Sequence, residues 1–294
     1  MSIYAYKMRE TFHEGDTIRD AGLHTPEDIE RFDDLVYGPD PKWNRLDVYR
    51  PKEKRGKLPV ILSIHGGGWV YGDKERYQYY CMRLAQNGFA VINYTYRLAP
   101  EFGYPAPLED TNLVASWIME NQDEYGLDTH HIFGVGDSAG ANTVGLYAAI
   151  LTNEDYANCY AFSAPEGFMF CALGTFCGTY QVDLYNEEDE ITLPLVAEYL
   201  QQGGTVVEMD RMNVLKHITK KFPPVFAATG TGDFLKIQIP PLAEALIRNE
   251  VAFDIRFYTS EQMELGHDFC CNVSLEKGQE CLEDACEFFK KYCN

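Results

Sequence analysis

The 294-residue sequence predicts an α/β protein with a mostly parallel central sheet and helices on both of its faces. Short apolar runs of strand length alternate with helical patterns over about 200 residues after position 44. Such alternation produces parallel strands, because each helix returns the chain to the same edge of the sheet. The composition, 46% hydrophobic and 24% charged, is globular and excludes a disordered or fibrous chain.

The expected strands are short and mostly apolar. Segment 44–50 (NRLDVYR) alternates like a strand with one buried face, whereas 58–64 (LPVILSI) is apolar enough to be buried on both. Further strands are expected at 89–94, 131–135, 224–228 and 253–258. Helical patterns are expected at about 75–87, 108–121, 139–152, 239–249 and 275–291. Together these elements form successive βαβ units.

Residues 1–43 precede this alternation. Thr25 and Pro26 have the features of a helix N-cap and a first helical residue, and two acidic residues follow them. Ile29, Phe32 and Val36 then recur at helical spacing. We therefore expect a helix here, before the sheet begins.

A second segment, 179–216, separates two strands by more than a simple connection requires. It contains an acidic run at 187–190 (EEDE) and a helical pattern near 194–201. Insertions of this kind are lids over a site or plain surface excursions, and the sequence leaves both open.

Charge and cysteine usage exclude several classes of partner. The net charge is 25 − 45 = −20, which argues against nucleic acid and against an anionic membrane surface. The most apolar later stretch, 167–178, is shorter than the roughly 20 residues of a membrane span. No apolar stretch of signal-peptide type begins the chain, so we expect a cytoplasmic protein with reduced cysteines. No two of the nine cysteines have CxxC spacing, so no zinc site or other metal is expected.

The motif GDSAG (136–140) lies between the strand expected at 131–135 and the helix expected at 139–152. This is the strand–turn–helix context of a G-x-S-x-G nucleophile elbow, which raises the serine hydroxyl above the sheet. The helix N-terminus behind Ser138 favours developing negative charge. The alternative is a tight turn in which Ser138 is an ordinary N-cap.

The motif HGGGW (65–69) follows the strand expected at 58–64. An ester-cleaving serine needs backbone N–H donors close to the oxyanion, and glycines let the backbone approach. An HGGG-type loop supplies such donors together with the N–H of Ala139, the residue after the serine. A plain glycine turn or a phosphate loop is the alternative, although no Walker or G-x-G-x-x-G pattern follows. We expect His65 to brace this loop rather than act as a base.

The general base and its acid should follow in the order serine, acid, histidine. Among seven histidines, His267 lies in the loop between the last expected strand and the last helix, from which it can reach Ser138. Asp233 follows the preceding strand and is the expected acid. Asp254 and Asp268 are rival acids, and Asp233 could instead be a helix N-cap.

With these residues in place, the sequence resembles the hormone-sensitive-lipase-like carboxylesterases of the α/β-hydrolase superfamily. The resemblance is carried by HGGGW (65–69), YRLAPE (96–101), GDSAG (136–140) and the loops of Asp233 and His267. It departs from the family where the acid is often written Asp-Pro-Leu-x-Asp, because this chain has DFLK at 233–236. In YRLAPE we expect Arg97 and Glu101 to form a structural ion pair.

The resemblance implies one α/β-hydrolase domain over 1–294, with cap elements at about 1–43 and 179–216. It also implies three catalytic residues and three oxyanion donors. These are Ser138 as nucleophile, His267 as base, Asp233 as acid, and the N–H groups of Gly67, Gly68 and Ala139.

The predicted activity is hydrolysis of neutral short-chain, acetyl-type esters through an acyl-enzyme, with no cofactor. An acidic rim at 187–190 would disfavour anionic substrates. Trp69 and Tyr71, in a group of aromatic residues after the glycine loop, are expected to bind substrate and could stack on an acetylated sugar; core packing is the alternative. An arylformamidase-like amidase and a non-catalytic ligand-binding module remain as alternatives, and a homodimer is left open.

Overall fold

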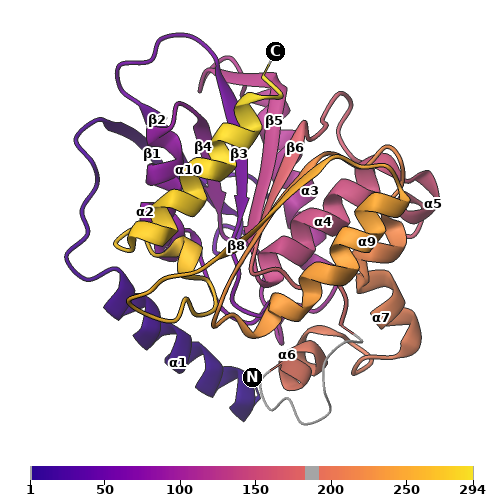
Figure 1. Ribbon diagram of the computed structural model, residues 1–294. Helices are drawn as coiled ribbons and strands as arrows, with labels where there is room; N and C mark the ends of the chain where they lie inside the picture. Colours follow the sequence, from indigo (N-terminus) through magenta and orange to yellow (C-terminus); the bar gives the residue numbers. More distant parts are fainter. Residues whose placement is uncertain (1, 183–191, 294) are drawn as a thin grey trace.

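The structure is a computed structural model and describes residues 2–182 and 192–293 (Figure 1). Its strands form one eight-stranded sheet. They are β1 (Ile29–Val36), β2 (Arg45–Pro51), β3 (Leu58–Ile64), β4 (Ala90–Tyr94), β5 (Leu127–Asp137), β6 (Ala172–Phe176), β7 (Val225–Gly230) and β8 (Phe253–Tyr258).

The spatial order of the strands is β1-β2-β4-β3-β5-β6-β7-β8. The first two join the sheet antiparallel, and β4, β3 and β5 to β8 are parallel. This arrangement confirms the α/β-hydrolase fold predicted from the sequence. It also brings the loops that follow β3, β5, β6, β7 and β8 to one end of the sheet, where ligands bind in open α/β folds.

Helices cover both faces of the sheet. The described helices are α1 (Ile3–Arg19), α2 (Lys74–Gln86), α3 (Ala106–Glu120), α4 (Ala139–Thr152), α5 (Glu154–Ala157), α6 (Thr192–Tyr199), α7 (Val206–Met212), α8 (Val214–His217), α9 (Ile239–Arg248) and α10 (Glu276–Lys290), with the short 3₁₀ helices η1 (Phe234–Gln238) and η2 (Phe269–Cys271). The helices α2 and α10 pack on one face, and α3, α4 and α9 lie on the other (Figure 1). Each face buries its own apolar cluster, so the sheet is covered on both sides. None of the helices in the described ranges is long and apolar enough to cross a bilayer.

Every strand and helix expected from the sequence after residue 44 corresponds to an observed element, with ends displaced by a few residues. The strand β6 was not among the predicted strands. It lies inside the apolar stretch 167–178, which is too short for a membrane span. The helical pattern near 194–201 becomes α6. The acidic run at 187–190 lies outside the described residues.

The helix predicted from Thr25 onward is wrong, because Ile29–Val36 is the edge strand β1. Its pairing with β2 shifts register between Phe32 and Leu35, where Asp34 adopts a φ of 58°. A bulge inserts extra residues and breaks the two-residue alternation, which makes the apolar spacing resemble that of a helix. The helix of this N-terminal segment is instead α1, which the sequence analysis did not predict.

Helix α1 lies across the end of the sheet where the glycine loop emerges (Figure 1). Arg9 of α1 donates to the carbonyls of Val70 and Ala99 at 2.6 and 2.8 Å and pairs with Glu101 at 2.7 Å. The predicted Arg97–Glu101 ion pair is therefore wrong. Arg97 instead pairs with the buried Asp110 at 2.9 Å, and Glu101 is used to hold α1.

Candidate active site

The GDSAG turn joins β5 to α4 with Ser138 in a strained conformation, at φ 50° and ψ −117°. A Cβ on Gly140 would lie 2.1 Å from the carbonyl oxygen of Ile64, and one on Gly136 would lie 2.4 Å from Gly140. Only glycine fits at both positions, because strand and helix approach so closely. Ser138 occupies the N-cap position of α4, but its side chain makes no capping hydrogen bond, so it is not an ordinary N-cap. Backbone strain at a residue that does not cap the helix is typical of a turn with a functional role.

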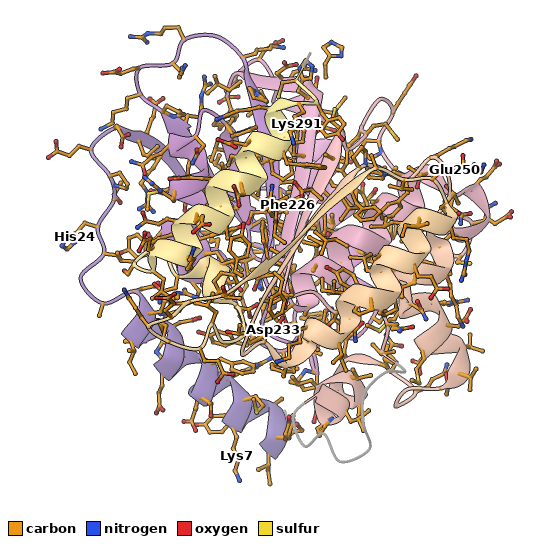
Figure 2. The ribbon with its side chains drawn as sticks, viewed as in Figure 1. Lys7, His24, Phe226, Asp233, Glu250 and Lys291 are labelled. Carbon is orange, nitrogen blue, oxygen red and sulfur yellow. The ribbon has the colours of Figure 1, made fainter. Side chains whose placement is uncertain are left out.

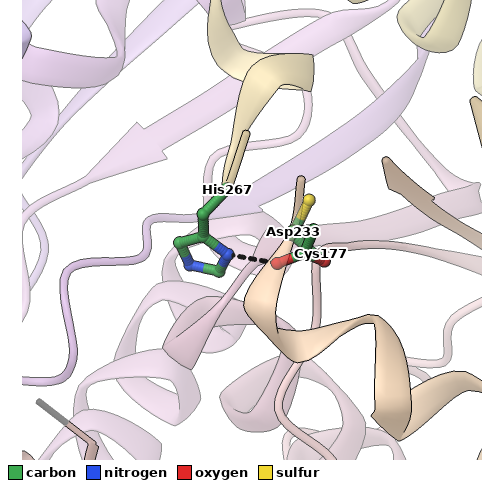
Figure 3. A group of neighbouring side chains, drawn as sticks. All are labelled: Cys177, Asp233 and His267. Atoms are coloured by element: carbon green, nitrogen blue, oxygen red, sulfur yellow. Dashed lines mark hydrogen bonds and ion pairs between the residues drawn. The ribbon is translucent and has the colours of Figure 1, made fainter. Parts of the chain in front are cut away.

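Three of the predicted site residues form one hydrogen-bonded line. The Nε2 atom of His267 lies 2.9 Å from the Oγ atom of Ser138. On the other side of the ring, Nδ1 lies 2.7 Å from Oδ1 of Asp233 (Figure 3). The residues come from the loops after β5, β7 and β8, and Asp233 lies at the end of the sheet beneath which α1 passes (Figure 2).

Asp233 is fully buried and remains an acceptor of several hydrogen bonds. The hydroxyl of Thr229 donates to its Oδ2 at 2.6 Å, and the backbone N–H of Leu235 donates to its Oδ1 at 3.0 Å. Burial disfavours the carboxylate, but these bonds and the contact with His267 outweigh burial and lower the pKa of Asp233. The carboxyl is therefore ionised at neutral pH, as a partner of an imidazolium must be.

The pKa of His267 is raised well above its ordinary value of 6.5. Burial opposes this shift, but the negative charge of Asp268 and the hydrogen bond to Asp233 outweigh burial. The imidazole therefore holds a proton more tightly than a free histidine does, and it acts as a base only in its neutral form.

The two rival acids stand elsewhere. Asp268 follows His267 at a φ of 56°, and its Oδ2 lies 3.2 Å from Nε2, the nitrogen that faces Ser138. It therefore contacts the wrong nitrogen to fix the tautomer. Asp254 is on β8 and pairs with Arg256 at 2.9 Å. Only Asp233, of these three carboxylates, contacts Nδ1.

The glycine loop after β3 turns through positive φ angles, 98° at Gly67, 59° at Gly68 and 60° at Trp69. A Cβ on Gly67 would meet the carbonyl oxygen of Tyr71 at 2.3 Å. The backbone N–H groups of Gly67 and Gly68 donate to no acceptor within residues 2–182 and 192–293. Unpaired donors beside a serine hydroxyl are what an oxyanion hole requires.

Asp137 and Tyr77 form a buried clamp that holds this loop against the elbow. Neither residue was among the predicted site residues. Asp137, inside GDSAG, accepts a hydrogen bond from the Tyr77 hydroxyl at 2.6 Å and one from the Gly66 backbone N–H at 3.2 Å. The same N–H lies 3.0 Å from the Tyr77 hydroxyl oxygen. Burial raises the pKa of Asp137 to about 6. The only hint in the sequence was an acidic residue next to the expected nucleophile.

His65 braces the loop as predicted. Its Nδ1 donates to the carbonyl of Gly66 at 2.8 Å, and its ring stacks on Tyr96 with 4.0 Å between ring centroids. Burial lowers the pKa of His65 to about 4, so the ring is neutral. Its ring contacts Gly66 and Tyr96 and supports the backbone of the loop.

A cavity of about 390 Å³ opens onto Ser138 and His267. Helix α1 contributes Phe12 and Asp16 to its wall, and α6 contributes Leu195. Gly67, Gly68 and Ala139 also line it, so all three predicted oxyanion donors face the same space as the serine. Elements from both ends of the chain thus enclose one site.

Trp69 and Tyr71, the predicted substrate-binding residues, both line this cavity. Trp69 is only 2% exposed, and its ring stacks on Tyr199 with 4.7 Å between centroids. The hydroxyl of Tyr71 donates to Asp16 of α1 at 2.8 Å. Tyr199 thus covers one face of the Trp69 ring, and little of the side chain is exposed to a ligand.

One group of described side chains could hold a metal ion: Cys177, Asp233 and His267 (Figure 3). Cys177 is buried at the end of β6 and has a φ of 45°. Hydrogen bonding with Cys270 lowers the pKa of Cys177, and hydrogen bonding with His267 lowers it further. Burial of the thiol acts in the opposite direction but is outweighed.

Comparison with known proteins identifies the family of this chain. The BD-FAE family matches residues 46–239, about two thirds of the sequence. The chain belongs to the BD-FAE family. This also confirms the resemblance to hormone-sensitive-lipase-like members of the α/β-hydrolase superfamily.

Curated relatives of this family member are esterases by name. Esterase LipQ of Mycobacterium tuberculosis is 27% identical over 239 residues, which cover 76% of this chain and 56% of LipQ. Versiconal hemiacetal acetate esterase of Dothistroma septosporum is 38% identical over 94 residues, 32% of this chain and 29% of that enzyme. The chain spans about half or less of the length of these relatives.

Among solved structures, esterase B from Lactobacillus rhamnosis superposes with a TM-score of 0.88 at 24% identity, covering 98% of this chain and 94% of the other. A hyperthermophilic esterase from Pyrobaculum calidifontis gives 0.79 at 23% identity, with coverage of 98% and 94%. At these identities the likeness shows the shared fold.

The BD-FAE match includes the glycine loop, the elbow and Asp233, but it ends before His267 and begins after α1. The position of His267 beside Ser138 and that of α1 over the cavity therefore lie outside the family match and come from the structure.

Proposed function

We propose that this BD-FAE family member is a serine carboxylesterase that hydrolyses neutral, short-chain esters. One observation carries the proposal: the line Ser138–His267–Asp233, with distances of 2.9 and 2.7 Å, lies at a cavity shared with the glycine loop. This is the arrangement that activates a serine toward a carbonyl carbon. The esterase names of the curated relatives agree with it.

In the proposed first step, Nε2 of His267 takes the Ser138 proton as Oγ attacks the ester carbonyl. Asp233 holds the proton on Nδ1 and stabilises the imidazolium that forms. The imidazolium then gives its proton to the departing alcohol and leaves an acyl-enzyme. Water, activated by the same imidazole, releases the acid and restores Ser138.

The developing oxyanion would be bound by the backbone N–H groups of Gly67, Gly68 and Ala139. The first two are without an acceptor in the described chain, and Ala139 begins α4, where the helix dipole adds positive potential. The clamp of Asp137 and Tyr77 holds the glycine loop beside the elbow, so the donors need no rearrangement during the reaction.

We also propose that α1 and α6 form the cap of a single domain and limit the acyl chain. Both contribute to the cavity wall, and Leu195 of α6 lies against the glycine loop. A volume near 390 Å³ suits an acetyl-to-hexanoyl ester of modest size. Acetylated carbohydrates are a narrower proposal, which Trp69 supports only weakly because its ring is stacked on Tyr199 and only 2% exposed.

An ester is proposed in preference to the N-formyl aryl amide of an arylformamidase, because the curated relatives are esterases by name. A non-catalytic binding module is disfavoured because Ser138, His267 and Asp233 are joined by hydrogen-bond contacts of 2.9 and 2.7 Å.

Replacing Ser138 with Ala tests the proposal. We expect hydrolysis of 4-nitrophenyl acetate or butyrate to fall on the order of 10⁶-fold in kcat, with loss of fluorophosphonate labelling. The exposed Ser163 supplies a matched control, because Ser163→Ala should keep both properties. Near-normal hydrolysis by Ser138→Ala would overturn the assignment.

Chain length is tested with acetyl, butyryl and octanoyl esters beside acetylated sugars. We expect rates to decline sharply at octanoyl. Acetylated sugars that react no faster than simple acetate esters would remove the carbohydrate proposal.

A further inference from the structure

We propose that this protein has an inhibitory site for thiophilic divalent cations, Zn²⁺ or its analogue Cd²⁺, formed by Cys177, Asp233 and His267. The site itself rests on donor geometry, whereas its inhibitory effect rests on the proposed esterase function. The proposed hydrolysis uses Asp233 and His267 but gives no task to Cys177, a buried thiol beside them.

The three donors come from separate parts of the chain and meet beneath the serine. Cys177 follows β6, Asp233 follows β7 and His267 follows β8, which are neighbouring parallel strands. One ligand atom from each lies within 4.8 Å of the other two, with the sulfur beside the Asp233 carboxylate (Figure 3). Cys177 is 1% exposed and Asp233 is fully buried, so two of the donors are already shielded from bulk water.

The donor set suits zinc. A thiolate, an imidazole nitrogen and a carboxylate bind Zn²⁺ at about 2.3, 2.0 and 2.1 Å, which places tetrahedral donors roughly 3.5 Å apart. The present donors therefore need to shift by about 1 Å, and the 2.7 Å contact between His267 and Asp233 must open slightly. The fourth position would be filled by water from the cavity.

Access to the site is through His267. Its side chain is 22% exposed and lines the cavity, and it follows Gly266, where an added Cβ would meet nothing within 4 Å. A small rotation of this loop side chain admits an ion from the cavity to Asp233 and Cys177. On binding, the Cys177 thiol releases its proton to solvent and the sulfur donates an electron pair to the metal.

Metal binding at this position stops the proposed reaction through the tautomer of His267. Nδ1 is the nitrogen on the Asp233 side, so it becomes the metal ligand and its proton passes through solvent to Nε2. A neutral imidazole bound through Nδ1 carries its proton on Nε2. Nε2 then donates to Ser138 instead of accepting its proton, and the base is lost while the serine stays in place.

The first test measures inhibition of ester hydrolysis by Zn²⁺ in the wild type, Cys177→Ser and Cys159→Ser. Cys159 is an exposed cysteine that does not line the cavity, and it controls for general thiol binding. Each variant is normalised to its own rate with chelator. We expect the half-inhibiting Zn²⁺ concentration to rise at least about tenfold in Cys177→Ser and to stay at the wild-type value in Cys159→Ser. Equal inhibition of all three proteins would overturn the proposal.

The second test reads the metal without activity. Cd²⁺ is titrated into Ser138→Ala, and the ultraviolet charge-transfer band of a cadmium thiolate is followed. We expect one equivalent to produce the band, and the added Cys177→Ser change to abolish it. A band that survives that change overturns the site. Because Ser138→Ala performs no hydrolysis under the proposed function, this result is independent of whether the protein is an esterase.

If Cys177→Ser does not fold, as judged by circular dichroism, the site is tested with all cysteines intact. Crystals of Ser138→Ala are soaked in Cd²⁺ and the anomalous signal is mapped. A peak between Sγ of Cys177, Oδ1 of Asp233 and Nδ1 of His267 supports the proposal. Peaks confined to surface carboxylates contradict it.

Discussion

Asp233→Asn separates the charge of the proposed acid from its shape. The side chain keeps its size, and its amide oxygen can still accept from Leu235 and from Nδ1 of His267, while the amide nitrogen faces the Thr229 hydroxyl. Thr229 can rotate its hydrogen and accept instead. The variant should therefore fold, and what it loses is the negative charge 2.7 Å from the imidazolium.

The magnitude follows from that distance. Opposite charges 2.7 Å apart at an effective dielectric constant of about 20 attract by roughly 6 kcal/mol. A neutral hydrogen bond to the amide oxygen retains about 1 kcal/mol. A loss near 5 kcal/mol in the transition state lowers kcat/KM about 10³- to 10⁴-fold, at 1.36 kcal/mol per tenfold.

The assay is kcat/KM for 4-nitrophenyl butyrate, with thermal melting to check the fold. Asp254→Asn is the matched control, because its carboxylate pairs with Arg256 on β8 and should leave the rate unchanged. Retention of more than about a tenth of wild-type kcat/KM in Asp233→Asn would refute the reasoning, since a loss of 5 kcal/mol cannot be so mild. So would a larger loss in Asp268→Asn.

Three further outcomes are expected. Asp268→Asn should move the acidic limb of the pH profile of kcat/KM to lower pH. The charge of the Asp268 carboxylate raises the pKa of His267, and His267 acts as a base only when it is neutral, above that pKa. An acidic limb that does not move would contradict this reasoning. Gly140→Ala should destabilise the fold by about 3 kcal/mol or more in thermal melts, because the new Cβ meets a β3 carbonyl at 2.1 Å. The control Gly15→Ala in α1 places its Cβ where nothing lies within 4 Å and should stabilise the fold by about 0.5–1 kcal/mol. Similar melting of the two variants would be inconsistent with the packing. Leu195→Ala should shift preference toward longer acyl chains by about tenfold, read from the ratio of octanoyl to acetyl kcat/KM, and an unchanged ratio would place the acyl group elsewhere.

The sequence by itself determined the strand and helix alternation after residue 44, since apolar periodicity depends on neighbours a few residues away. It also located the elbow, because a strained turn between strand and helix requires GDSAG-like residues in consecutive positions. The same local reasoning failed at β1, where a bulge at Asp34 changes the spacing and pairing with β2 overrides the helix-like pattern.

Tertiary structure decided everything that depends on residues far apart in the chain. The sequence favoured Asp233 as the acid over its rivals Asp254 and Asp268, but only the meeting of the loops after β7 and β8 shows which carboxylate contacts Nδ1. Arg97 was given the wrong partner, because the buried Asp110 reaches it from a helix later in the chain.

The same reason explains what the motifs could not show. Cys177 precedes Asp233 by 56 residues, so no spacing rule for metal ligands finds it, yet neighbouring strands of the sheet end side by side. Helix α1 lies at the opposite end of the chain from His267 and still shares its cavity. The sequence specified the elements and the nucleophile through local patterns, whereas the partners of each functional atom were fixed only when the parallel sheet brought the ends of its strands together.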